Sequence, residues 1–174
     1  WSVLVGPEHL LAETVILGGD GGVNGGANLH PRLFVDQFEA TSRGDTARVE
    51  NNRLWSTWNA AIRVTGDDAA LRGNAVGTST SDHGLFVKGA RAKIERNTVT
   101  DVSSDGIHVE GDAADVLDNE VWGAGDDGID VDGESFEVRG NLVVDAVDAS
   151  AGIHVNNGQG LAAETAVVED NYVR

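Results

Sequence analysis

Ionisable side chains recur at nearly the same spacing in the second half of the chain. His108, Asp130 and His154 follow one another at steps of 22 and 24 residues, and each stands between two aliphatic residues. Glu110 and Asp132 follow two residues later in the same phase. If these segments form neighbouring parallel strands, the side chains lie about 4.8 Å apart on one outer face. Such a group could bind a cation or transfer protons.

A second set of carboxylates comes just before these segments. Asp105 and Asp127 each precede a glycine that begins the next segment, and Asp126 stands beside them. Carboxylates this close together raise one another's pKa unless a cation lies among them. Ca²⁺ prefers such oxygen ligands, whereas histidines would recruit a transition metal. We expect Asp105, Asp127 and Asp132 as the candidate metal ligands, for Ca²⁺; the alternative is a polar outer face on an acidic protein.

An internal repeat indicates which elements position these residues. Four segments align with one another: IRVTGDDAALRGNAV from Ile62, LFVKGARAKIERNTV from Leu85, IHVEGDAADVLDNEV from Ile107 and IDVDGESFEVRGNLV from Ile129. A looser fifth segment starts at Ile153, and the five first residues are separated by 23, 22, 22 and 24 residues. Asparagines recur in the same phase at Asn52, Asn74, Asn97, Asn119, Asn141 and Asn171.

The repeat predicts an all-β fold, a right-handed parallel β-helix of about five to six coils over residues 47–174. A coil of about 22 residues is too short for paired helices, and the Ile-x-Val alternation is typical of short strands. We expect the asparagines to form a hydrogen-bonded ladder and to adopt left-handed backbone. The corner glycines, just before the first strand of each coil, are expected to supply backbone freedom; they are Gly84, Gly106, Gly128 and Gly152. Stacking places in the core Ile62, Val64, Leu85, Val87, Ile107, Val109, Ile129, Val131, Ile153 and Val155.

This repeat resembles that of pectate-lyase-like and mannuronan-epimerase-like proteins, over about residues 47–173. The resemblance implies a polysaccharide that the chain binds or modifies. Proton abstraction beside a uronate carboxyl needs a base, a group that neutralises the carboxylate, and an acid. If the chain is an enzyme, we expect Lys88, His108 and Asp130 to be catalytic. His108 or Lys88 would be the base, and Ca²⁺, Arg63 or Lys88 the neutralising cation.

Other side chains are candidates for contacts with the sugar. We expect Arg63, Trp122 and His154 to bind substrate. Trp55, Trp58 and Trp122 either stack on sugar rings or cover exposed core at a coil corner. Both interpretations of the tryptophans are open.

The first 46 residues follow a different pattern. VGPEHLLAE, GGDGGVNGGANLHPRL and FEATSRGD resemble the last two β/α units of the dihydrodipicolinate synthase and sugar-acid aldolase family of TIM barrels. Pro7 at a first turn, with Leu10, Leu11 and Val15 on one face, predicts a helix, and a second helix is entered at Pro31. We expect helix before Ala47 and strand after it. The two lysines of this chain, Lys88 and Lys93, lie in the repeats, where they cannot match the family's Schiff-base lysine. Residues 1–46 are expected to be an α/β or helical cap; a fusion and a truncation are the alternatives.

The charge balance limits the partners. The chain has 29 acidic and 12 Lys and Arg residues, a formal net charge of -17, which repels the phosphate backbone of nucleic acids. This balance is also typical of a halophilic proteome. The sequence has no cysteine and no apolar run long enough for a membrane span. For the β-helix we expect an extracellular or cell-surface location.

Three functions are therefore compatible with the sequence. The first is a β-helix module that binds or modifies polysaccharide, as a polyuronate lyase or epimerase if it is catalytic. The second is a non-catalytic structural or surface solenoid. The third is a truncated lyase of the dihydrodipicolinate synthase family that lacks its Schiff-base lysine.

Overall fold

The computed structural model describes residues 16–18, 34–36, 40–43, 45–57, 60–79, 82–146, 151–156 and 166–174. For residues 16–18, 34–36, 40–43 and 56–57 it describes the backbone alone. The described residues form strands and turns without a helix, which confirms the predicted all-β class. Within the described part of the chain, no helix has the length and apolar character to span a membrane.

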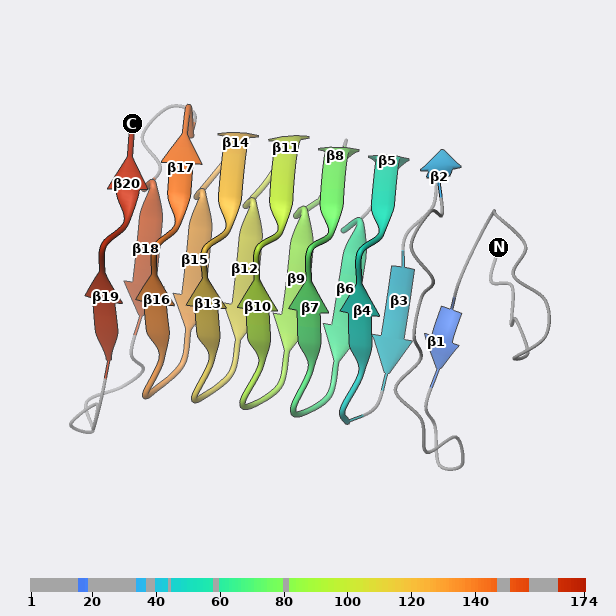
Figure 1. Ribbon diagram of the computed structural model, residues 1–174, viewed down its shortest axis with the longest axis horizontal. Helices are drawn as coiled ribbons and strands as arrows, with labels where there is room; N and C mark the ends of the chain where they lie inside the picture. Colours follow the sequence, from blue (N-terminus) through green and yellow to red (C-terminus); the bar gives the residue numbers. More distant parts are fainter. Residues whose placement is uncertain are drawn as a thin grey trace.

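The strands form three parallel sheets that run along a solenoid (Figure 1). Sheet A contains β1 (Ile16–Gly18), β3 (Ala40–Arg43), β6 (Ile62–Thr65), β9 (Leu85–Lys88), β12 (Ile107–Glu110), β15 (Ile129–Asp132) and β18 (Ile153–Asn156). Sheet B contains β2 (Phe34–Asp36), β5 (Arg53–Thr57), β8 (Ala75–Ser79), β11 (Thr98–Val102), β14 (Glu120–Ala124), β17 (Leu142–Val144) and β20 (Tyr172–Val173). Sheet C contains β4 (Arg48–Glu50), β7 (Ala70–Arg72), β10 (Lys93–Glu95), β13 (Asp115–Leu117), β16 (Glu137–Arg139) and β19 (Val167–Glu169).

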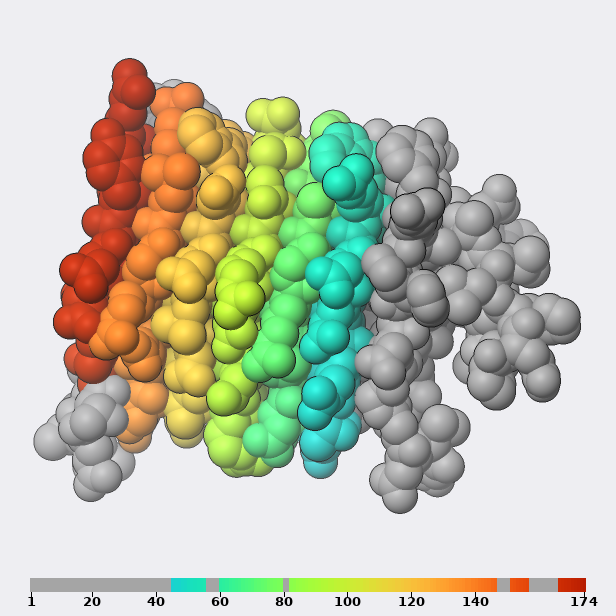
Figure 2. Space-filling view, in the orientation of Figure 1, coloured from blue at the N-terminus to red at the C-terminus, as the bar shows by residue number. Residues whose placement is uncertain are grey.

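Each coil passes through sheet A, then sheet C, then sheet B. Strands β6 to β17 form four complete turns of this kind, and Figure 2 shows the coils as successive stripes packed side by side. In sheet A, Ile107 is aligned with Leu85 on one side and with Ile129 on the other. The predicted parallel β-helix and its register are therefore confirmed.

Aliphatic side chains from all three sheets fill the interior. Ile107, Val116 and Val121, one from each sheet of a single coil, are fully buried. Because equivalent residues stack from coil to coil, the core is one continuous column. Val155 departs from the prediction, since it is 36% exposed: no described coil stacks on β18 beyond β15.

The asparagine ladder is present, but its backbone differs from the prediction. Both the backbone N and Nδ2 of Asn97 donate to Oδ1 of Asn119, at 2.9 and 3.0 Å. The left-handed residue of this turn is the one before each ladder asparagine, with φ of 53° at Arg96 and 54° at Asp118. The prediction of left-handed ladder asparagines is wrong, because the residue before each asparagine makes the left-handed turn. The asparagine itself provides the side-chain hydrogen bonds between coils.

The corner glycines are needed for space rather than for backbone freedom. Gly106, just before β12, has no left-handed φ. A Cβ there would lie 2.3 Å from Cγ1 of Val121 and 2.5 Å from the carbonyl oxygen of Gly128 in the next coil. Close packing of the corner against the core and the neighbouring coil therefore requires glycine.

The stacked strands extend further toward the N-terminus than expected. The predicted helix between Pro31 and Ala47 is wrong where the chain is described, because β2 and β3 are strands. β3 pairs with β6 and β2 pairs with β5, both in parallel. The backbone hydrogen bonds of these segments are thus made across coils, which a helix would not allow. The predicted helix after Pro7 lies mainly outside the described residues, and the division of the chain at residue 46 stays a prediction.

Candidate functional site

The outer positions of sheet A carry most of the predicted site residues. Parallel pairing aligns Phe86, His108, Asp130 and His154 in successive strands, with Arg63 aligned beside Phe86. This row was expected to face solvent, but Phe86 is only 8% and Asp130 only 9% exposed. The difference arises because side chains from the corners before these strands pack against the row.

Imidazole and carboxylate groups alternate along this surface. Asp105 Oδ2 lies 3.0 Å from Nδ1 of His83 and 3.0 Å from Nδ1 of His108. Nδ1 of His108 also lies 3.1 Å from Oδ2 of Asp130. Nδ1 of His154 lies 3.0 Å from Oδ1 of Asp130. We call the resulting group the imidazole–carboxylate chain; its members are His83, Asp105, His108, Asp130, His154 and Asp127.

The two carboxylates around His108 stabilise its protonated form. Burial alone would lower the pKa of His108, but hydrogen bonds to Asp105 and Asp130 raise it to about 10. Burial likewise opposes ionisation of Asp105, yet the hydrogen bonds from His108 and His83 hold the pKa of Asp105 below its ordinary value. His108 is therefore cationic near neutral pH, which favours a role as a positive charge or proton donor over that of a base.

Lys88 is linked to the imidazole–carboxylate chain through Glu110. Lys88 forms an ion pair with Glu110 on the adjacent strand β12, and this contact is the main cause that lowers the pKa of Glu110. Oε1 of Glu110 lies 3.6 Å from Nε2 of His108. Of the residues predicted to be catalytic, His108 and Asp130 are in contact, and Lys88 is linked to them by Glu110.

Arg63 lies at the end of the outer row of sheet A that is opposite His154. Its Nη2 lies 2.6 Å from Oδ2 of Asp82, and its guanidinium carbon lies 4.2 Å from the centre of the Phe86 ring. The Phe86 ring in turn stacks on His108, with ring centres 5.4 Å apart. The predicted substrate residues Arg63 and His154 therefore stand in the same row, but on opposite sides of His108.

The predicted metal ligands fall into two groups. Asp105, Asp126 and Asp127 place one oxygen each within 4.8 Å of one another, whereas Asp132 belongs to a group with His108 and Asp130. Burial is the main cause that raises the pKa of Asp127, and the charges of Asp105, Asp126 and Asp130 add to it. A cation would relieve this repulsion. Ca²⁺ as the bound ion stays a prediction.

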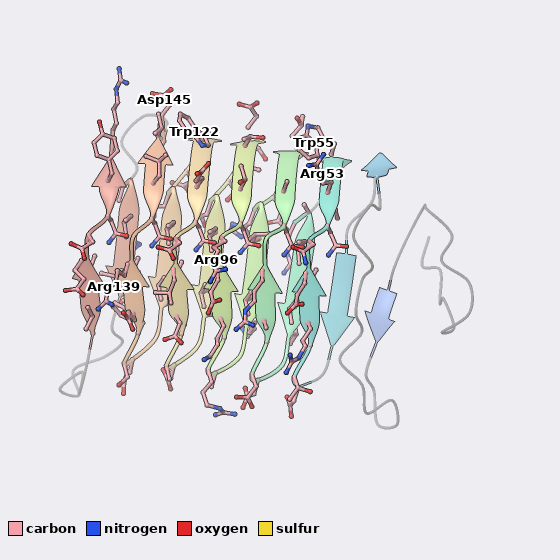
Figure 3. All side chains as sticks on the ribbon, viewed as in Figure 1. Arg53, Trp55, Arg96, Trp122, Arg139 and Asp145 are labelled. Atoms are coloured by element: carbon pink, nitrogen blue, oxygen red, sulfur yellow. The ribbon has the colours of Figure 1, made fainter. Side chains whose placement is uncertain are left out.

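Trp122 lies on a different sheet from the rest of the predicted site. Trp122 in β14 and Trp55 in β5 (Figure 3) occupy the same outer row of sheet B. The strand pairing places Gly77 and Thr100 between them. Trp122 is 40% and Trp55 37% exposed. Tyr172, which is 59% exposed, stands on β20 of the same sheet. Trp58 lies outside the described residues.

Two residues of the site were missed by the sequence analysis. His83 stands immediately before the corner glycine Gly84, in the position that Asp105 and Asp127 occupy before the next two glycines, and Asp82 stands one residue earlier, in the position of Asp126. This phase was the signal that could have identified them. Backbone pairing confirms it, since the amide of Gly84 donates to the carbonyl of Asp105 in the next coil at 3.0 Å.

Comparison with known proteins identifies the architecture. No curated protein and no solved structure matches the chain, so neither the pectate-lyase-like subfamily nor the aldolase resemblance is supported by a relative. A family model described as the right-handed β-helix region matches residues 38–174. That match starts close to β3 and includes all of the coils from there to β20. The chain therefore belongs to the right-handed β-helix family.

Proposed function

We propose that this β-helix is a polysaccharide-binding module and that the outer face of sheet B is its binding surface. The observation that carries the proposal is the position of the exposed aromatic rings. Among the described residues, the large aromatic side chains that are exposed are Trp55, Trp122 and Tyr172, and all three lie on sheet B. Partly exposed indole rings present an apolar face to which a sugar ring can bind by stacking.

The spacing of the two tryptophans suits an extended chain. The backbones of Trp55 and Trp122 are separated by three strand steps, which corresponds to about 14 Å. The residues between them in this row, Gly77 and Thr100, are small. A linear polymer can therefore lie along the solenoid and contact both indoles. The hydroxyl of Thr100, which donates to the carbonyl oxygen of Val76 at 3.4 Å, can still accept a hydrogen bond between them.

The charge of the protein favours a neutral polysaccharide. The formal net charge of -17 repels a polyuronate at low ionic strength. The positive groups of sheet A do not offset this repulsion, because each is paired with carboxylates: Arg63 with Asp82, Lys88 with Glu110, and His108 with Asp105 and Asp130. We therefore expect tighter binding to neutral glucans or xylans than to polygalacturonate.

Native affinity electrophoresis tests the proposal directly. The full chain is run through gels that contain a soluble β-glucan, xylan or polygalacturonate, with albumin as the non-binding reference. The expected result is retardation by at least one neutral polysaccharide. The non-catalytic structural solenoid would be favoured instead if no polysaccharide retarded the chain.

Chemistry on uronates is a second candidate function, supported by the His108–Asp130 contact in sheet A. Perturbed ionisable groups of this kind are typical of active sites and also of structural ion-pair networks. Eliminative cleavage of polygalacturonate or alginate creates an unsaturated product whose ultraviolet absorbance can be followed, and epimerisation can be followed by proton NMR. Activity that is lost in Lys88→Ala and His108→Ala would support this candidate, whereas an inactive wild-type chain would exclude it.

A further inference from the structure

Three side chains converge at the end of the imidazole–carboxylate chain nearest β18. Asp127 stands at the corner before β15, Asp130 lies in β15 and His154 lies in β18. Nδ1 of His154 is 3.0 Å from Oδ1 of Asp130 and 3.5 Å from Oδ2 of Asp127. One ligand atom from each residue lies within 4.8 Å of the other two.

Each carboxylate has one oxygen bound to the protein and one directed at His154. Oδ1 of Asp127 accepts a hydrogen bond from the backbone N of Ala151 at 2.6 Å. Oδ2 of Asp130 lies 3.1 Å from Nδ1 of the cationic His108. These contacts orient the carboxylates and leave Oδ2 of Asp127 and Oδ1 of Asp130 beside Nδ1 of His154. Outer contacts of this kind commonly position metal ligands.

One of these ligand atoms, Oδ1 of Asp130, lacks a hydrogen-bond partner. Asp130 is 9% exposed, and its Oδ1 is buried without a hydrogen bond. His154 is close to this oxygen but is not aligned to donate to it. A buried carboxylate oxygen without a donor is costly, and its cost is removed when a cation binds to it.

We propose that Asp127, Asp130 and His154 bind one divalent transition-metal ion, of the Zn²⁺ or Co²⁺ class, through Oδ2, Oδ1 and Nδ1. Bonds of about 2.0–2.1 Å to a tetrahedral Zn²⁺ place neighbouring ligand atoms about 3.3–3.4 Å apart, close to the distances of 3.0 and 3.5 Å seen here. Ca²⁺ is disfavoured, because it takes six to eight oxygen ligands and does not prefer imidazole.

The neighbouring group of His83, Asp105 and His108 is a weaker candidate. Both oxygens of Asp105 already accept hydrogen bonds, Oδ1 from the backbone N of Asp127 at 3.0 Å and Oδ2 from His108 at 3.0 Å. At the proposed site the side chain of His154 is 52% exposed, so that a metal held there would keep a position open to water. The inference does not depend on polysaccharide binding, which involves a different sheet.

The test uses the full chain after treatment with a chelator and dialysis. Addition of CoCl₂ is expected to produce a saturable visible absorption band at one Co²⁺ per chain, and ZnCl₂ is expected to abolish the band by displacement. Isothermal titration with ZnCl₂ then gives the affinity of the wild-type chain. His154→Ala is the decisive variant, because its exposed side chain can be removed without disturbing the core.

We expect His154→Ala and Asp130→Asn each to weaken Zn²⁺ binding at least tenfold. His83→Ala and the control Asp115→Asn, on the outer face of sheet C, are expected to keep the wild-type affinity, and circular dichroism checks that every variant is folded. The proposal would be overturned if neither Co²⁺ nor Zn²⁺ bound saturably, if His154→Ala bound like the wild type, or if CaCl₂ displaced the Co²⁺ stoichiometrically.

Discussion

The indole of Trp55 lies against Gly77 of the next coil, so that a Cβ added to Gly77 would be 2.9 Å from both Cε2 and Nε1 of Trp55. The position of this ring thus depends on a glycine in the neighbouring strand. We predict that Gly77→Ala displaces the indole and weakens retardation by a neutral polysaccharide severalfold in affinity gels. Ala75→Val, which enlarges another outer residue of β8 away from Trp55, is the control. Equal binding by both variants would show that the ring position is irrelevant.

The asparagine ladder gives a prediction for stability. Oδ1 of Asn97 accepts hydrogen bonds from the backbone N and the Nδ2 of Asn74, both at 2.9 Å. Asn97→Ala leaves these buried donors without a partner, so we expect a loss of about 3 kcal/mol in the free energy of unfolding, measured by urea denaturation. Asn156→Ala, at an exposed position of β18, should change it by less than about 0.5 kcal/mol. Similar losses in both variants would contradict a special role of the ladder.

His108 gives a prediction for the pH dependence of stability in chelator-treated protein. The groups that face it are Asp105, Asp130, Glu110 and His83. Its pKa is about 10 in the folded chain, above the ordinary value of about 6.5 expected in the unfolded chain. The folded state binds this proton more tightly, so the stabilisation is complete below about pH 6.5 and is lost as the pH rises toward 10.

Urea denaturation at pH 6, 8 and 10 measures this effect. The wild-type chain is expected to lose stability over this range more steeply than His108→Gln, which cannot take up the proton. Parallel pH profiles of the two proteins would show that His108 is not the group that titrates.

The fold was predictable because every coil repeats the same physical requirement. The aliphatic alternation around Ile107 and Ile129 predicts strands whose aliphatic side chains point into the core. The equal phase of Asn97 and Asn119 predicts a hydrogen-bonded ladder. Together these two patterns determine the register of the coils. The strand at β3 was missed because its sequence, Ala40–Arg43, lacks the Ile-x-Val pattern. Its strand structure comes from pairing with β6, which local sequence does not reveal.

The site was only partly predictable. Strand alternation and register predicted that His108, Asp130 and His154 lie side by side. They did not predict that residues of the corners pack against this row. For that reason His83 was missed, and the burial of Phe86 and Asp130 was not foreseen. The charge state of His108 also depends on contacts with Asp105 that cross a corner, and strand alternation alone cannot give such distances.

The central claim is that Trp55 and Trp122 together bind polysaccharide on sheet B. The most direct measurement is the dissociation constant from affinity electrophoresis in β-glucan and xylan gels for the wild type, Trp55→Ala, Trp122→Ala and the double variant, with Lys93→Ala on sheet C as the control. Each single variant is expected to bind about tenfold more weakly, and the double variant more weakly still, while Lys93→Ala binds as the wild type does. Retardation of the double variant equal to that of the wild type would contradict the claim.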